Sequence, residues 1–188
     1  MMKVTLLGDS IRQIGYGTLV PELLKDEFEV WQPNDNCRFA KYTLRGMWDW
    51  AEPMKGSRIV HWNNGLWDAC KLFGDGNFSS KDEYVECMCR IAKILLSRHD
   101  KVIFATTTPV TEQNPHNKNE DIIAFNEALV PRLKELGVII NELHALVYSD
   151  IDAYIRKDDN IHLTEEGIRA CAEQVARVIR ETAATLDA

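Results

Sequence analysis

The chain has 188 residues, of which 45% are hydrophobic, and its 22 Lys and Arg against 29 Asp and Glu give a formal net charge of -7. A chain of this size can bury a core as one domain, and no Pro-, Gly- or Ser-rich linker or block of charge divides it, so a single domain over residues 1–188 is predicted. The basic residues are scattered rather than gathered in a stripe, which argues against a nucleic-acid partner.

No apolar run approaches the roughly 18 residues that a membrane span needs, and the first apolar segment is too short for a signal peptide. We therefore expect no membrane span and a cytoplasmic location. Without an export signal, cysteines favour free thiols over disulfides. The pair in Cys87-Met88-Cys89 lacks partners at zinc spacing, so neither a metal nor a cofactor is expected. The five cysteines are Cys37, Cys70, Cys87, Cys89 and Cys171.

Strand and helix patterns alternate along the chain, which is typical of a parallel sheet covered by helices on both faces. An apolar strand at residues 4–7 leads into Gly8-Asp9-Ser10. Thr18 is expected to cap a short helix that holds Pro21 in its first turn and ends near Asp26. A strand at 28–31, a loop at 33–41, a short helix at 43–50 and a third strand at 58–62 are predicted to follow.

The second half continues the alternation. Ser80 and Glu83 have the spacing of a capping box for a helix that reaches about residue 98. Residues 102–106 form an apolar run suited to the buried centre of a parallel sheet. The remaining predictions are a helix at 119–136 that stops at Gly137, a strand at 138–140, short helical turns at 142–155, and a final amphipathic helix capped by Thr164.

Five strands and their helices predict an α/β protein, a three-layer α/β/α sandwich of the flavodoxin-like kind around a five-stranded parallel sheet. In such a sheet, ligands bind at the carboxyl ends of the strands. Every polar motif falls at such an end, so we expect these motifs to meet on one edge. In strand order, they are Ser10, residues 36–42, the pair Asn63 and Asn64, residues 107–109, and residues 159–162.

Ser10 is a candidate nucleophile, but a serine hydroxyl reacts poorly unless a base removes its proton. The segment Asp159-Asn160-Ile161-His162 offers such a base. His162 would accept the proton and return it to the leaving group, while Asp159 would hold the imidazole tautomer and stabilise its cation. Gly-Asp-Ser alone is an ordinary turn sequence, and a lone His162 is more often buried or capping, but together they favour catalysis.

A Gly-Asp-Ser at the end of the first strand with an Asp-x-x-His before the last helix resembles the SGNH hydrolase (GDSL esterase/lipase) superfamily. The resemblance extends over the whole chain. It implies the SGNH hydrolase fold and a carboxylic ester hydrolase in which Ser10, His162 and Asp159 form a catalytic triad that works through an acyl-enzyme.

The resemblance also implies an oxyanion hole made from the Ser10 backbone N–H, a backbone N–H in the second block and an asparagine side chain in the third. The second block, Asn36-Cys37-Arg38-Phe39-Ala40-Lys41-Tyr42-Thr43, lacks the usual glycine, and Ala40 stands about where it would fall. Ala40 is therefore the expected donor, with Gly46 as a weaker candidate. In the third block Asn63 is expected to be the donor and Asn64 is the alternate.

The expected substrate is a small-molecule ester, in the first place an acetylated sugar, so the predicted activity is that of a carbohydrate O-acetylesterase. A lysophospholipase or thioesterase activity is the alternative. Arg12, Arg38 and Tyr42 lie on loops beside the site, and Trp62 and Trp67 flank the asparagines, where flat rings suit a sugar. For the tryptophans, packing in the core or at its rim is the competing interpretation. Substrate-binding candidates are Arg38, Tyr42, Trp62, Asn64 and Trp67.

Two interpretations without catalysis compete with the esterase. A nucleotide-binding Rossmann domain would use Gly15-x-Gly17, but the third glycine of its motif is replaced by Val20 and the glycines begin well beyond the strand. A non-catalytic flavodoxin-like binding module would keep the fold and leave Ser10, Asp159 and His162 without a joint purpose.

Overall fold

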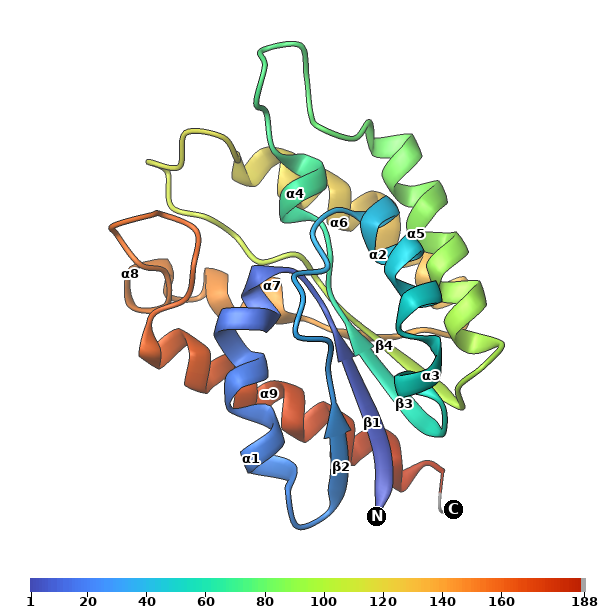
Figure 1. The fold of residues 1–188 in the computed structure, drawn as a ribbon. Coiled ribbons are helices and arrows are strands. Elements are labelled where there is room, and N and C mark those ends of the chain that lie inside the picture. Colours follow the sequence, from blue (N-terminus) through green and yellow to red (C-terminus); the bar gives the residue numbers. More distant parts are fainter. Residues whose placement is uncertain (187–188) are drawn as a thin grey trace.

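The computed structural model describes residues 1–186, in which five strands form one sheet with the order β2-β1-β3-β4-β5 (Figure 1). All neighbouring strands pair in parallel. This confirms the predicted α/β/α architecture and its five-stranded parallel sheet. The strands are β1 (Met2–Leu7), β2 (Phe28–Trp31), β3 (Ser57–Trp62), β4 (Lys101–Ala105) and β5 (Ile139–Asn141).

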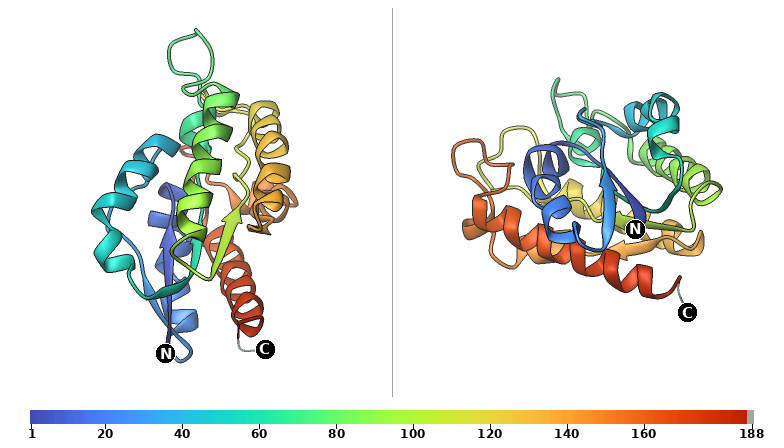
Figure 2. Two further views of the ribbon diagram at one scale, coloured as in Figure 1. Left: turned by 90° about the vertical axis from the view of Figure 1, so that its right-hand side faces the viewer. Right: turned by 60° about the horizontal axis from the view of Figure 1, so that its bottom comes forward.

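Helices cover both faces of the sheet (Figure 2). On one face lie α1 (Val20–Leu24) and α9 (Glu165–Ala184), and on the other lie α2 (Ala40–Asp49), α5 (Lys81–Leu96) and α6 (Asn119–Glu135). Short turns join them: η1 (Ile11–Gly15), η2 (Tyr16–Thr18), α3 (Ala51–Met54), α4 (Leu66–Ala69), α7 (Leu143–Tyr148) and α8 (Ile151–Tyr154).

The central strands are apolar because both of their faces are buried. Val102, Ile103 and Phe104 of β4 are fully shielded from solvent, as are Ile59 and Val60 of β3. Continuous hydrophobic runs of this kind are expected in a parallel sheet with helices on both sides. The buried centre makes the sheet a rigid support for the loops at the carboxyl ends of its strands.

The expected helix signals at three positions act as predicted. At the start of α5, Ser80 Oγ accepts from the Glu83 amide at 3.3 Å and the Ser80 amide donates to the Glu83 carboxylate at 3.1 Å, a reciprocal capping box. Thr164 Oγ1 accepts from the Gly167 amide at 3.0 Å and caps α9. Gly137 follows α6 with a φ of 90°, a conformation that glycine adopts without strain.

Two predicted helix starts are wrong. Thr18 does not cap α1, because it belongs to η2 and its hydroxyl donates back to the Gly15 carbonyl at 2.8 Å. Helix α2 begins at Ala40, three residues before the predicted start at 43. Its first amide donates to Asp68 Oδ2 at 2.9 Å, so the capping carboxylate comes from α4, distant in the sequence, and leaves no local signal.

All five cysteines are free thiols, as the sequence predicts. Within residues 1–186, no helix is both long enough and apolar enough to cross a bilayer.

Candidate active site

Ser10 stands at the point where β1 turns into the helical turn η1. Asp9 Oδ1 accepts from the Ile11 amide at 2.9 Å, and the Asp9 carbonyl accepts from the amides of Arg12 and Gln13. Ser10 has ordinary helical dihedrals, φ -62° and ψ -25°, so its backbone is unstrained. As the first amides of a helical turn have no preceding carbonyl to bond, the Ser10 N–H is suited to receive a negative charge.

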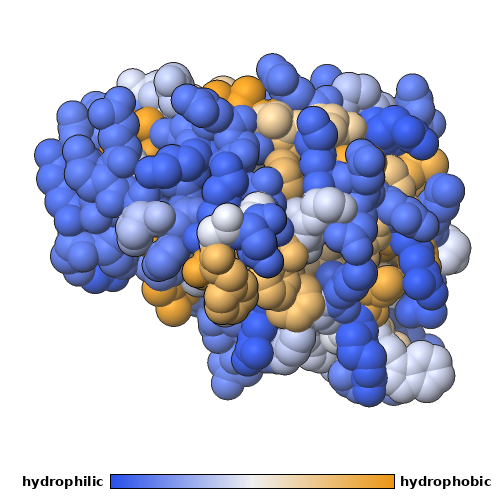
Figure 3. All heavy atoms as spheres, turned by 90° about the horizontal axis from the view of Figure 1, so that it is seen from above, coloured by the Kyte–Doolittle hydropathy of each residue, from blue (hydrophilic) through white to orange (hydrophobic). Residues whose placement is uncertain are grey.

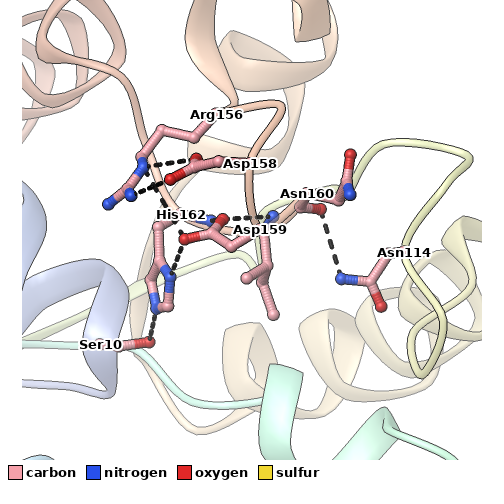
Figure 4. Close-up of polar contacts among 8 residues, drawn as sticks. Ser10, Asn114, Arg156, Asp158, Asp159, Asn160 and His162 are labelled. Carbon is pink, nitrogen blue, oxygen red and sulfur yellow. Dashed lines mark hydrogen bonds and ion pairs between the residues drawn. The ribbon is translucent and has the colours of Figure 1, made fainter.

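The structure brings the three residues of the expected triad into one hydrogen-bonded row (Figure 4). His162 Nδ1 donates to Asp159 Oδ2 at 2.9 Å, since a carboxylate only accepts. This leaves His162 Nε2 as an acceptor for the Ser10 hydroxyl, whose oxygen is 2.9 Å away. A serine hydroxyl, an oriented imidazole and a supporting carboxylate are the parts that activate a nucleophile.

Hydrogen bonds within the loop between α8 and α9 hold Asp159 and His162 in place. Asp159 Oδ1 accepts from the amides of Ile161 and His162 at 3.1 and 3.0 Å, respectively. The Arg156 amide donates to the His162 carbonyl at 2.8 Å and closes the loop on itself. The acid and the base therefore reach each other without help from another part of the chain.

A second set of contacts fixes this loop to the segment after β4 (Figure 4). Asn160 adopts a left-handed conformation with φ 64°, and its Oδ1 accepts from the Thr111 hydroxyl at 2.7 Å. The Asn160 carbonyl accepts from the Thr111 amide at 3.2 Å and from Asn114 Nδ2 at 3.3 Å. These bonds fix the position of the loop, and therefore the position of His162 relative to Ser10.

Asp159 is held in its charged form. Burial alone would raise the pKa of this carboxyl, but the hydrogen bonds from the His162 amide and ring and from the Ile161 amide outweigh burial and lower the pKa below its ordinary value. Arg156 Nε lies 3.8 Å from Asp159 Oδ2 and also pairs with Asp158. A negative Asp159 at neutral pH favours the Nδ1–H tautomer of His162.

Asn63 follows β3 and is held at both ends of its side-chain amide. Its Nδ2 donates to Asp9 Oδ1 at 2.8 Å, and its Oδ1 accepts from the Tyr16 hydroxyl at 2.6 Å. A side-chain amide carries two N–H groups, and Asp9 takes one. The other is suited to an oxyanion beside Ser10, the residue next to Asp9.

Gly8 is required by this placement of Asn63. A Cβ atom on Gly8 would lie 2.1 Å from Asn63 Oδ1 and 2.7 Å from Arg12 Cβ, closer than real atoms approach. The glycine of Gly-Asp-Ser thus leaves the space that the Asn63 side chain fills.

Asn64 and Trp62 do not face the expected substrate site, and their assignment as binding residues is wrong. Both are fully buried. Trp62 Nε1 donates to Asn64 Oδ1 at 3.0 Å, while Asn64 Nδ2 donates to the Arg38 carbonyl at 2.7 Å. The Trp62 ring packs edge-on against Phe104, with 4.9 Å between the ring centroids. Successive side chains of an extended chain point to opposite sides, so Asn64 points away from the side that Asn63 faces. Its hydrogen bonds instead join the end of β3 to the loop after β2.

Ala40 is not available as the second-block oxyanion donor. Its N–H is the group that Asp68 Oδ2 accepts, and Ala40 is buried. Ser79 donates its hydroxyl to Asp68 Oδ1 at 2.6 Å, so the carboxylate is held on both oxygens. Gly46 lies within α2, away from the helix start. Of the expected oxyanion donors, the Ser10 amide and Asn63 Nδ2 remain.

The other residues expected near the substrate divide into two groups. Arg12 is buried, and its guanidinium donates to the carbonyls of Gly8 and Pro33, so it ties the loop after β2 to β1 instead of lining a pocket. Arg38 is exposed, and its guanidinium lies 4.6 Å from the centroid of the Tyr42 ring. Trp67 is 40% exposed. Arg38, Tyr42 and Trp67 stay predictions for substrate contact.

No protein-family model matches the chain. It is 27% identical over 161 residues to the GDSL esterase/lipase WDL1 of Oryza sativa subsp. japonica, a match that covers 78% of this chain and 62% of that protein. The chain thus spans about three-fifths of the length of this relative.

Solved structures share the fold at low sequence identity. An acetyl xylan esterase, AlAXEase, is similar with a TM-score of 0.79, 21% identity and coverage of 95% of this chain and 100% of that one. A lipase/acylhydrolase from Enterococcus faecalis is similar with a TM-score of 0.78 and 19% identity, and the match covers 97% of each chain. The acetylxylan esterase Axe2 from Geobacillus stearothermophilus has a TM-score of 0.75 and 15% identity, and the match covers 94% of this chain and 93% of that one.

Fold and motifs therefore define an α/β/α protein of the SGNH type, with Gly-Asp-Ser after the first strand and Asp-x-x-His before the last helix. The chain is similar in sequence to a GDSL esterase/lipase and in fold to solved acetylxylan esterases and a lipase/acylhydrolase.

Three residues of the site gave no signal in the sequence. Tyr16 reaches Asn63 only because η1 and η2 bring it back over the end of β3, and the irregular helical turn has no recognisable pattern. Asp68 accepts a hydrogen bond from the Ala40 amide, 28 positions away in the sequence, and Thr111 donates one to Asn160, 49 positions away. Among residues 1–186, no group of three or more His, Cys, Asp or Glu side chains is arranged to hold a metal.

Asp9 should make stability depend on pH. Burial raises the pKa of this carboxyl from 3.8 to about 6, against the opposing effect of its hydrogen bonds from Asn63 and Ile11. Because the folded state then binds the proton more tightly than the unfolded state, ionisation of Asp9 destabilises the protein as the pH rises from about 4 to beyond 6. A shift of roughly two pKa units corresponds to on the order of 3 kcal/mol.

An Asp9→Asn variant cannot ionise at this position. Measured by denaturant unfolding at pH 4 and pH 8, its free energy of unfolding should increase relative to that of wild type by on the order of 3 kcal/mol at the higher pH. Asp75→Asn, on an exposed loop, is the matched control and should show no such trend. A difference between Asp9→Asn and wild type that stays constant with pH would contradict the buried charge.

Proposed function

We propose that the chain is a serine esterase that hydrolyses small acyl esters through an acyl-enzyme on Ser10. The observation that carries this proposal is the contact of 2.9 Å between Ser10 Oγ and His162 Nε2, with Asp159 at the other ring nitrogen. The esterase and lipase names of the relatives support the same class of reaction.

In the proposed reaction His162 takes the proton of the Ser10 hydroxyl as the oxygen attacks the ester carbonyl. The C–O bond to the alcohol then breaks, and the alcohol leaves with that proton. Water repeats the sequence on the acyl-enzyme, with His162 again the base, and releases the carboxylic acid and free Ser10. Asp159 stays ionised and stabilises the imidazolium formed in each step.

The tetrahedral intermediates carry a negative oxygen that needs fixed donors. The Ser10 N–H and the second N–H of Asn63 Nδ2 are proposed for this role, since Ser10 caps η1 and Asn63 Nδ2 is held 2.8 Å from Oδ1 of Asp9, the residue before Ser10. Donors fixed in this way commonly contribute about 3 kcal/mol each to the transition state.

For the substrate we propose an acetylated carbohydrate. Two structurally similar proteins are acetylxylan esterases. Arg38 on the loop after β2 and Trp67 in α4 are exposed, and Tyr42 in the first turn of α2 is half-buried; such aromatic and guanidinium groups stack on sugar rings or donate to their hydroxyls.

An ester with a longer acyl chain is the second candidate, because the loop between α4 and α5 exposes apolar side chains. Phe73 is 81% exposed, and Leu72 and Phe78 in the same loop are about half exposed. Seen from the carboxyl ends of the strands, the surface is mostly hydrophilic but contains apolar patches (Figure 3). Such surface would suit the chain of a lysophospholipid or thioester.

Ser10 is the residue on which the proposal depends. A fluorophosphonate probe should label wild type at Ser10, and Ser10→Ala should abolish labelling and lower kcat on p-nitrophenyl acetate by about four to six orders of magnitude. Ser149→Ala, an exposed serine, is the control and should behave as wild type. No labelling of wild type and no turnover would favour the non-catalytic binding module.

The two adjacent asparagines should differ in their effects. Asn63→Ala should lower kcat by about a hundredfold or more with little change in KM, since the lost N–H acts on the transition state. Asn64→Ala should mainly lower the melting temperature, because its amide bonds the Arg38 carbonyl and Thr43 inside the protein. A larger loss of kcat in Asn64→Ala would refute the assignment of Asn63.

A substrate series separates the two substrate classes. If the alcohol is a sugar, kcat/KM should be highest for acetylated xylo-oligosaccharides and should fall steadily along p-nitrophenyl esters from acetate to octanoate. Trp67→Ala should then raise KM for the oligosaccharide and leave p-nitrophenyl acetate unaffected. A rise of kcat/KM with acyl length would instead favour the lysophospholipase or thioesterase activity.

A further inference from the structure

Tyr16 is a buried residue that the proposed reaction does not yet use. It opens η2, six residues after Ser10, and its side chain is fully shielded from solvent. Its hydroxyl donates to Asn63 Oδ1 at 2.6 Å, a short contact for two neutral groups. The ring meets the buried His61 edge-on, with 5.5 Å between centroids. Packing and a hydrogen bond therefore both fix where the hydroxyl points.

The orientation of the Asn63 amide decides whether it donates or accepts toward the oxyanion. An asparagine amide has nearly the same shape when its oxygen and nitrogen exchange places, so packing alone does not choose between them. Asp9, as a carboxylate, accepts and so selects the Nδ2 side, while the Tyr16 hydroxyl donates to Oδ1. The two partners act on opposite ends of the amide and favour the same orientation.

We propose that Tyr16 is a positioning residue of the oxyanion hole, holding the Asn63 side chain so that the second Nδ2–H faces the substrate carbonyl oxygen. The inference rests on the proposed esterase function. Tyr16 touches neither substrate nor Ser10 in this role and acts through Asn63 alone.

The surroundings of Tyr16 keep its hydroxyl protonated, so that it can donate to Asn63. Burial raises its pKa well above the ordinary range, so the O–H stays protonated at any pH at which the protein works. Burial also lowers the pKa of His61 to about 3, so the ring against Tyr16 stays neutral. His61 Nε2 accepts from Asn141 Nδ2 at 3.1 Å, which anchors this ring to β5.

Tyr16→Phe removes only the hydroxyl and leaves Asn63 Oδ1 without this donor. The amide then keeps only its bond to Asp9 and is held less firmly, which weakens the placement of the proposed oxyanion donor. We expect kcat on p-nitrophenyl acetate to fall by about 10- to 100-fold with KM within about twofold of wild type, because the donor acts on the transition state.

Tyr84→Phe is a matched control. Tyr84 is equally buried and its hydroxyl donates to the backbone carbonyl of the neighbouring Asn64 at 3.0 Å. Both substitutions delete one buried hydroxyl, so both should lower the melting temperature, but only Tyr16→Phe should lower kcat. A double variant completes the test: in an Asn63→Ala background, Tyr16→Phe should cause no further loss of kcat. Equal losses of kcat in the two Phe variants, or additive losses in the double variant, would overturn the proposal.

A measurement without turnover separates this inference from the proposed function. In NMR spectra of wild type, the side-chain amide of Asn63, assigned by its absence from Asn63→Ala, should give two resolved protons protected from solvent exchange. Tyr16→Phe should broaden or shift this pair, and Tyr84→Phe should not. Fast exchange of the wild-type amide would refute the positioning role even if Tyr16→Phe fails to fold, whereas unlabelled Ser10 with a protected Asn63 amide would refute only the esterase.

Discussion

The site depends on one pairing in the sheet, that of β1 with β3. Leu7 lies opposite Trp62, and the Asn63 amide donates to the Leu7 carbonyl at 3.2 Å, so Gly8 and Asn63 leave the sheet side by side. A shift by one residue would turn Asn63 inward and Asn64 outward. Two residues then hold the Asn63 side chain in this position. Gly8, which has no Cβ, leaves room for it, and the carboxylate of Asp9 accepts one of its N–H groups.

The parts of this protein that follow from local rules were predictable. Apolar runs gave the five strands, Ser80 with Glu83 and Thr164 marked two helix starts, and Gly137 marked an end. The approach of His162 to Ser10 was also foreseeable, because parallel strands place their carboxyl ends on one edge. The proximity of Asp159 to His162 follows from a spacing of three residues in a tight loop.

What could not be predicted comes from contacts between distant segments. The start of α2 and the loss of Ala40 as a donor have one cause, the carboxylate of Asp68, which caps the helix from α4. Trp62 looked available for a sugar because it borders polar residues, yet it is the last residue of a central strand and its ring belongs to the core. Burial of a residue at a strand end depends on what the neighbouring loops cover, and no local pattern records this.

The self-closed loop that carries Asp159 and His162 has a consequence for how the chain acquires activity. Acid and base are joined by short-range bonds, whereas the bond from His162 to Ser10 joins residues 152 positions apart. Contacts of such separation form late in folding, since closing a long loop costs entropy before the contact offsets it. A folding chain would therefore assemble its proton-transfer pair early and meet its nucleophile last, when α9 docks beside α1. Regain of reactivity at Ser10 during refolding would then report the docking of the final helix rather than the formation of the sheet.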